Sequence, residues 1–337
     1  MTQMKFLLVM VVLLMTACSR QPAVKVEHVL GQTMGTTYNV KFPEVAGVDE
    51  AAIKSAIDKR LVQVNKLMST YDPTSELSRF NQYRFAEPFA VSDETLLVVN
   101  EALRLGELSN GVLDVTVGPL VNLWGFGPTM RPETIPSEAD VAAVREYVGL
   151  DKLQVQGNAL VKGHPQLYVD LSTIAKGYGV DVVADLLEEN GIHDYLVEIG
   201  GEMRVKGEKG DGSPWLIAIE KPVSNQRAVQ KVVSIGENAI ATSGDYRNYY
   251  EQDGTRYSHL IDPRTGKPIQ HNTVAVTVVH SSSMTADGLA TAFNVMGWED
   301  AIEVAEANDI AVFIIRRKDK DFEEYTSPAF EELVTVY

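Results

Sequence analysis

The sequence predicts a protein of the α+β or mixed α/β class, and three observations lead to this fold class. Segments with helical spacing of apolar residues are interspersed with short runs typical of strands. The two kinds of segment do not follow the regular strand–helix–strand repeat of a barrel or a doubly wound sheet. The chain has 337 residues, 45% of them hydrophobic and 23% charged, which is enough for one large domain or two intimately packed ones.

Helices are predicted where apolar residues recur every three or four positions between capping signals. The first carries Ile53, Ile57 and Leu61 on one stripe, and the second follows a Ser92 cap. The predicted helices are 49–68, 92–109, 137–149, 172–189, 284–296 and 299–307.

Strands are predicted for short apolar runs, which are more frequent in the second half of the chain. The first of these runs turns back on itself at Gly157-Asn158. The predicted strand segments are 153–161, 167–171, 195–199, 215–220, 231–235, 274–279 and 311–315.

The N-terminus predicts a secretory signal. Lys5 precedes ten apolar residues, about half of the roughly 20 that cross a bilayer, and small residues then lead to Cys18. This position of the cysteine is typical of a bacterial lipoprotein. We therefore expect residues 1–17 to be removed, Cys18 to be lipidated, and residues 18–30 to contain a tether.

An ordinary signal peptide with an incidental cysteine is the alternative. Cys18 is the only cysteine of the chain, which excludes an internal disulfide, thiol catalysis and a cysteine-based metal site. The residue after it is Ser19 and not Asp, which leaves the choice between inner and outer membrane open.

The formal charge of −16 argues against binding to nucleic acid, because phosphate backbones require a basic surface. It also means that an anionic substrate needs a cation at its site. The sequence contains no P-loop, no dinucleotide-binding glycine fingerprint, no H-E-x-x-H helix and no G-x-S-x-G elbow. The six histidines are scattered, unlike a structural zinc site.

The segment MTADGLATAF places Asp287 and Thr291 four residues apart, on one face of a predicted helix. With Thr285 as N-cap, Asp287 would lie in the first turn and could point at a ligand. A carboxylate and a hydroxyl suit a hard cation such as Mg²⁺. An acidic residue at a helix start that only complements the helix dipole is the alternative.

The segment DLSTIAKGYGVD places Lys176 at a predicted helix start, where free backbone N–H groups favour anions. Ser172 as an ordinary N-cap with Lys176 on the surface is the alternative. Gly177 and Gly179 each weaken a helix by about 1 kcal/mol, which makes sense where the backbone must lie close to a partner.

Three further segments combine polar residues with predicted strands or turns. Gly35 and two threonines in GQTMGTTYNV are also consistent with a turn that enters an edge strand. Tyr71 precedes a turn and a Ser75 cap, and is either a core residue or a platform for an aromatic ligand. His259 ends a predicted strand before the polar turn 262–266, which is also consistent with a bare hairpin.

Taken together and in this order, eight segments resemble the ApbE family of FAD:protein FMN transferases. These segments are MGTTY (34–38), STYDPTSELSRFN (69–81), GVLDVTVGPLVNLWGFG (111–127), DLSTIAKGYGVD (170–181), VEIGGEMRVKG (197–207), ATSGDY (241–246), YSHLIDPRTGKP (257–268) and MTADGLATA (284–292). The resemblance implies a single ApbE-like catalytic domain over 31–337, built of two packed subdomains with the FAD site between them.

The resemblance also assigns roles to residues at matching positions. Thr173, Asp287 and Thr291 would bind Mg²⁺, with the Ala175 carbonyl nearby. His259 would be the general base, with an aspartate near the metal such as Asp287 as its rival. The residues that would line the FAD site are Met34, Tyr71, Val112, Leu113, Asp114, Asp170, Lys176 and Ile261.

The implied reaction transfers the FMN half of FAD to a threonine of a partner protein and releases AMP. A Mg-dependent FAD pyrophosphatase, which releases FMN and AMP, is one alternative, and a non-catalytic FAD-binding lipoprotein is another. The expected acceptors are flavin-carrying subunits of membrane redox pumps of the Nqr and Rnf types. The expected location is the periplasmic side of the inner membrane, with the outer membrane as the alternative.

Overall fold

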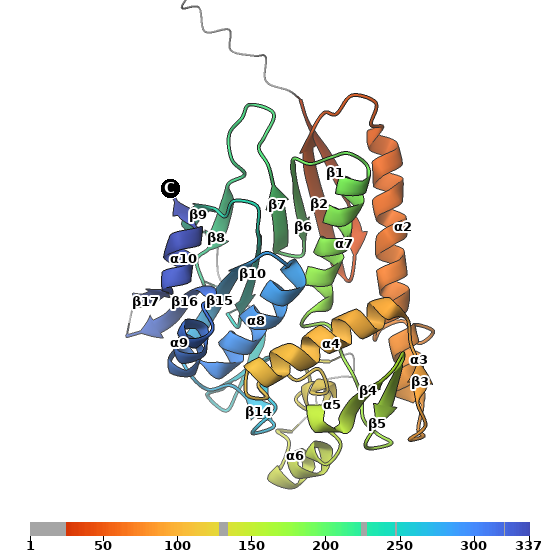
Figure 1. The fold of residues 1–337 in the computed structure, drawn as a ribbon. Coiled ribbons are helices and arrows are strands. Elements are labelled where there is room, and N and C mark those ends of the chain that lie inside the picture. Colours follow the sequence, from red (N-terminus) through yellow and green to blue (C-terminus); the bar gives the residue numbers. More distant parts are fainter. Residues whose placement is uncertain (1–24, 128–133, 224–227, 247, 320) are drawn as a thin grey trace, which may run out of the picture.

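An eight-stranded antiparallel sheet lies at the centre of the computed structural model, which describes residues 25–127, 134–223, 228–246, 248–319 and 321–337. Figure 1 shows the sheet behind a layer of helices. In spatial order its strands are β1 (Val26–Thr33), β2 (Thr36–Pro43), β6 (Tyr195–Ile199), β7 (Glu202–Lys206), β10 (Ala239–Gly244), β15 (Thr273–His280), β16 (Ala311–Lys318) and β17 (Asp321–Thr326).

Four helices pack against one face of this sheet: α2 (Glu50–Met68), α7 (Ala175–Glu189), α8 (Ser283–Met296) and α9 (Trp298–Ala307). In Figure 1, α2, α7 and α8 follow one another across the sheet. Alternate strand residues such as Tyr38 and Val40 are buried beneath them. The remaining residues of these strands point to the opposite face.

A small sheet and a short helix cover part of that opposite face. The strands lie in the order β18 (Thr335–Val336), β9 (Val229–Ser234) and β8 (Ile217–Glu220), and the helix is α10 (Pro328–Leu333). Trp215, Phe313 and Phe330 belong to the core between the two sheets. Because β8 is the last strand in this order, it is an edge strand of the small sheet.

The rest of the chain forms a smaller helical and hairpin region beside the large sheet, with α4 crossing below α7 and α8 in Figure 1. Its helices are α3 (Glu76–Gln82), α4 (Asp93–Leu108), α5 (Gly118–Leu123) and α6 (Glu138–Arg145), with a 3₁₀ turn at Leu150–Lys152. Its strands are β3 (Phe89–Ala90), β4 (Leu153–Gln156), β5 (Ala159–Lys162), β11 (Tyr249–Gln252), β12 (Thr255–Ser258), β13 (Ile261–Asp262) and β14 (Lys267–Pro268).

The mixed α/β class is confirmed, and so are several predicted element boundaries. Ser75, Ser92 and Ser137 each accept a backbone hydrogen bond at the start of a helix. The hairpin with its turn at Gly157-Asn158 is present as β4 and β5. Among the described residues, the helices are too short or too polar to cross a bilayer.

The predicted strand at 167–171 is wrong, because side chains and not a neighbouring strand satisfy its backbone. The side-chain amide of Asn81 pairs with both the N–H and the C=O of Val169, at 2.8 Å each. The amine of Lys162 donates to the Leu167 carbonyl at 2.7 Å. The segment is extended but belongs to no sheet.

Two helix starts differ from those predicted. Helix α7 begins at Ala175 and not at 172, because the Ser172 N–H binds Asp170 in a local turn at 2.9 Å. The N-cap of α8 is Ser282 and not Thr285, which places Asp287 in the second turn. Thr285 instead donates its hydroxyl proton to Glu101 at 2.6 Å.

Strand β1 begins at Val26, so residues 26–30 belong to the folded domain and not to the tether. Backbone pairing with β2 starts at Val26 opposite Pro43. The signal peptide, Cys18 and the tether up to residue 24 lie outside the described residues and stay predictions.

Candidate active site

A cavity of about 420 Å³ lies where α7 and α8 meet the loop after α4 and the hairpin region. Its walls contain residues from six of the eight segments that carried the resemblance. The predicted site residues among its walls are Val112, Leu113, Asp114, Thr173, Lys176, His259, Ile261, Asp287 and Thr291.

The two helices that carry Lys176 and Asp287 touch through their backbones. A Cβ atom on Gly177 would lie 2.2 Å from the Ser283 carbonyl oxygen, so the contact requires glycine. A Cβ atom on Gly179 would lie 2.9 Å from the methyl end of Met34. Both glycines lie against a partner, as the helix-weakening cost of glycine in this segment led us to expect.

A carboxylate from each helix caps the other helix. Asp287 on α8 accepts the N–H of Gly177, the third residue of α7, at 3.0 Å. Asp181 on α7 accepts the N–H groups of Ser283 and Met284, at the start of α8, at 3.0 Å each. These donors have no partner within their own helix, so each carboxylate satisfies a helix start and fixes the position of the other helix.

Lys176 sits between two buried carboxylates. Its amine lies 2.7 Å from Glu202 Oε1 and 3.5 Å from Asp287 Oδ1. Burial opposes the charge on Lys176, but the two carboxylates outweigh it and raise the pKa of the amine. Burial raises the pKa of Asp287, against the opposing effect of Lys176.

Glu202 is a buried carboxylate of the site, and one of its two oxygen atoms accepts no hydrogen bond from a described residue. Burial and the charge of Asp287 raise its pKa to about 7, although Lys176 acts in the other direction. It is 5% exposed, and its Oε2 atom accepts no hydrogen bond in the described part of the chain. The cavity therefore contains two acidic groups and one ammonium within a few ångströms.

The hydroxyl groups of the cavity suit an oxygen-binding cation. Thr173 Oγ1 is buried and has no hydrogen-bond partner among the described residues, and Thr291 lies one turn after Asp287 on α8. The described residues contain no cluster of three or more His, Cys, Asp and Glu side chains that could hold a metal. A cation here would need hydroxyl or carbonyl ligands besides Asp287, which is a donor set of the kind Mg²⁺ takes.

His259 is held at the other side of the cavity by its backbone and its ring. Its Nδ1 atom lies 2.9 Å from the Asn248 carbonyl, and its own N–H donates to the same oxygen at 3.1 Å. Because a carbonyl only accepts, Nδ1 carries the proton and Nε2 has the free lone pair. Burial lowers the pKa of His259 from its usual 6.5, which favours the neutral ring at pH 7.

The ApbE family model matches residues 34–314. The chain belongs to the ApbE family. A Vibrio cholerae relative named FAD:protein FMN transferase is 56% identical over 324 residues, which cover 96% of this chain and 97% of the relative. One of the same name from Haemophilus influenzae is 47% identical over 327 residues, covering 95% and 94%.

Solved structures of ApbE proteins have the same fold. The flavin transferase ApbE from Vibrio cholerae superposes with a TM-score of 0.87 at 56% identity, covering 92% of this chain and 99% of that one. The apo form of the flavinyl transferase ApbE from Pseudomonas stutzeri gives a TM-score of 0.86 at 41% identity, covering 93% and 98%.

Three residues assigned to the FAD site by the ApbE resemblance lie outside the walls of the cavity. Met34 is in the β1–β2 turn with a positive φ of 48° and packs on α7. Tyr71 is 76% exposed before α3, so the core alternative for this residue is wrong. Asp170 binds the backbone of Ser172. Their roles toward FAD stay predictions.

Asp114 lies in the cavity wall of this ApbE-family chain, but its carboxylate already accepts hydrogen bonds within its own turn. One carboxylate oxygen accepts both the N–H and the hydroxyl of Thr116, at 2.7 and 2.6 Å. Burial raises the pKa of Asp114, and these hydrogen bonds act in the other direction. Val112, Leu113 and Ile261 supply the apolar part of the same wall.

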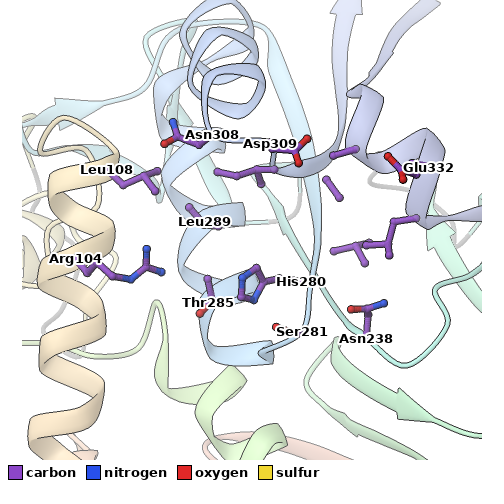
Figure 2. A pocket seen from close by; sticks show the side chains of 15 residues that line it. Arg104, Leu108, Asn238, His280, Ser281, Thr285, Leu289, Asn308, Asp309 and Glu332 are labelled. Atoms are coloured by element: carbon purple, nitrogen blue, oxygen red, sulfur yellow. The ribbon is translucent and has the colours of Figure 1, made fainter.

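A larger cavity, of about 810 Å³, lies on the other side of α8 and contains none of the predicted site residues. Figure 2 shows Arg104 from α4 opposite Thr285 and Leu289 of α8, with His280 at the end of β15. Three of its polar side chains already have partners. Arg104 and Thr285 both bind Glu101, and His280 Nδ1 accepts the Ser282 N–H at 3.0 Å.

Sequence reasoning missed two residues that organise the ApbE site. Glu202 lies in the segment VEIGGEMRVKG, directly after the Gly200-Gly201 turn, and is the buried first residue of β7. The position of this acidic residue beside the glycine turn was the available signal. Asp181 lies one turn after Gly177 on the same helix as Lys176. Its role depends on the position of α8, which the sequence pattern does not supply.

Proposed function

We propose that this protein is a Mg²⁺-dependent FAD:protein FMN transferase that attaches FMN to a threonine of a partner protein. Membership of the ApbE family and the names of its relatives support the transferase activity. The observation that supports the metal site is that Thr173, whose hydroxyl has no hydrogen-bond partner among the described residues, lines one cavity with Asp287 and Thr291.

These three residues would hold the metal, through one carboxylate and two hydroxyl oxygens. When bound, Mg²⁺ would neutralise phosphate charge in a protein whose own charge is −16. Lys176 adds a second positive charge at the start of α7, where the helix dipole also favours an anion. The carboxylates of Asp287 and Glu202 keep this lysine protonated.

His259 is placed to accept the proton of the attacking threonine. Its Nδ1–H is held by the Asn248 carbonyl, and its Nε2 lone pair is free. The threonine oxygen forms a bond to the phosphorus of the FMN half, and the bond from that phosphorus to the AMP oxygen breaks. The proton passes to Nε2, and AMP leaves.

We propose flavin-carrying subunits of Nqr- and Rnf-type redox pumps as acceptors. A lipid anchor at Cys18 would keep the enzyme at the periplasmic side of the inner membrane, where such subunits could meet it. The proposal rests on the family resemblance and on the N-terminal sequence.

The test incubates the mature protein with FAD, MgCl₂ and the soluble domain of an Nqr-type acceptor subunit. Intact-mass spectrometry should show the acceptor gaining FMN less one water, and the same acceptor with its threonine changed to valine should gain nothing. Free FMN without acceptor modification would identify a pyrophosphatase. FAD that is retained unchanged would identify a flavin-binding lipoprotein.

A further inference from the structure

A third cavity, of about 630 Å³, lies on the face of the large sheet opposite α2, α7, α8 and α9. Its floor comes from alternate residues of β2 and β6: Thr37, Asn39 and Lys41 on one strand, and Leu196 and Glu198 on the other. The residues between them, such as Tyr38 and Val40, are buried under the helices. We call this cavity the acceptor groove.

The edge of β8 forms one wall of the acceptor groove. Five consecutive residues, 216–220, line it, including buried Ile217 and Ile219 as well as exposed Leu216 and Ala218. Successive residues of a strand point to opposite faces, so a cavity touched by all of them runs along the strand's edge. The only strand paired with β8 in the described part of the chain is β9.

The acceptor groove borders the catalytic cavity. Gly200 and Thr242 line both. Gly200 and Gly201 form the turn between β6 and β7 with φ values of 60° and 109°, so this boundary carries no side chain from the turn. Glu202, directly after the turn, lies in the catalytic cavity. A chain in the groove therefore meets no large side chain at the glycine turn.

We propose that the acceptor groove binds an extended segment of the acceptor protein, which pairs with the edge of β8 and delivers its threonine past Gly200. This inference rests on the proposed transferase function and names the surface that its protein substrate uses. The edge of β8 away from β9 pairs with no strand in the described part of the chain, and such an edge offers backbone hydrogen bonds to an extended chain. The polar floor at Thr37, Asn39 and Glu198 favours polar side chains on the segment's inner face.

The test fills the groove without touching the catalytic cavity. Thr37 is exposed on the groove floor, so Thr37→Trp should block the segment. Thr335→Trp is the matched control, because Thr335 is also exposed on a strand but lies on β18, at the opposite edge of the small sheet. The measurements are FAD affinity by calorimetry and the rate of acceptor modification by intact-mass spectrometry.

Thr37→Trp is expected to raise KM for the acceptor domain tenfold or more while FAD affinity stays within twofold. Thr335→Trp should match the wild type in both. An unchanged KM in Thr37→Trp would overturn the groove proposal. A wild type that modifies no acceptor would instead refute the proposed function, so the two failures are distinguishable.

Hydrogen–deuterium exchange tests the pairing itself, with the threonine-to-valine acceptor domain as the probe. Amides of residues 216–220 should exchange more slowly when this acceptor is added, and those of β18 should not change. Unchanged exchange in β8 at an acceptor concentration that saturates binding would overturn the proposal, whether or not the acceptor is modified.

Discussion

The two carboxylate oxygens of Asp287 make different contacts, and the proposed function gives this residue a chemical task besides its structural one. Its Oδ2 atom accepts the Gly177 N–H, and its Oδ1 atom faces Lys176. The first contact bears on the alternative that Asp287 only stabilises the start of its own helix. It caps α7 and not its own helix α8, and it still presents an oxygen to the cavity.

Replacing Asp287 should separate these two tasks. Asp287→Asn keeps an oxygen for the Gly177 N–H but removes the charge that a cation needs, so Mg²⁺-dependent turnover should fall roughly 100-fold or more. Asp287→Ala should abolish turnover. Activity assays and circular dichroism are the measurements.

An Asp287→Asn variant with near-wild-type activity would contradict the ligand role. An Asp287→Ala variant that loses its circular-dichroism spectrum would show that the capping role dominates. The matched control is Asp185→Asn, because Asp185 is an exposed carboxylate of α7, outside the cavity.

The pH dependence of transfer should follow His259. Because burial lowers its pKa from the usual 6.5, the ring is a free base at pH 7, and the rate should be level there. The rate should fall tenfold per pH unit once the pH is below the folded pKa, which lies under 6.5. Single-turnover rates from pH 5 to 8.5 measure this.

His259→Gln should remove both the rate and this acidic limb. An acidic limb centred above pH 6.5 in the wild type, or a wild-type rate in His259→Gln, would argue for a different base.

At the scale of elements, the decisive contact is the crossing of α7 and α8. Local patterns and caps predicted the helices α2, α4 and α6, because their signals lie within the segment itself. They misplaced the start of α7, where the Asp170–Ser172 turn delays the helix and Asp287 supplies the cap from more than a hundred residues away. They also misplaced the start of α8, where the local N-cap is Ser282 and not Thr285. The strand predicted at 167–171 failed because Asn81, which is distant in the sequence, holds it.

Gly177 and Gly179 offer a matched pair of substitutions on one helix. Gly177→Ala forces a Cβ atom into the Ser283 carbonyl and should lower the free energy of unfolding by about 1–3 kcal/mol and reduce activity. Gly179→Ala meets the side-chain ends of Met34 and Ile199 and no backbone atom, and it gains helix propensity, so its stability should be close to that of the wild type.

Urea denaturation measures both changes. Equal effects of the two alanines would contradict the proposed backbone contact.

Lys162 should make the free energy of unfolding depend on pH. It is buried, donates to the carbonyls of Asn81 and Leu167, and burial lowers its pKa to about 8. Between pH 8 and 10.5 the unfolded chain still binds the proton that the folded chain has lost. This residue therefore makes the free energy of unfolding rise with pH over that window, by an amount on the order of 1–3 kcal/mol.

The comparison with Lys162→Met isolates this contribution from those of other groups. The free energy of unfolding of the wild type, minus that of Lys162→Met, should increase from pH 8 to pH 10.5. A difference that is constant over this window would show that Lys162 has an ordinary pKa.

At the scale of the whole molecule, the large sheet has a cavity on each of its two faces. Its helical face carries the cavity with Asp287, Thr173 and His259, and its opposite face carries the acceptor groove. The sequence alone placed Asp287 and Thr291 on one helical face. The family resemblance was needed to add Thr173 and His259, because the periodicity of a sequence does not predict that two helices and a hairpin meet. Glu202 escaped both kinds of reasoning.

The most direct measurement of the central claim is the intact mass of an acceptor domain incubated with this protein and FAD, with and without Mg²⁺. The account predicts a gain of one FMN phosphoester on the threonine when Mg²⁺ is present and no gain when EDTA replaces it. A gain that persists in EDTA, or release of free FMN with the acceptor unchanged, would contradict it.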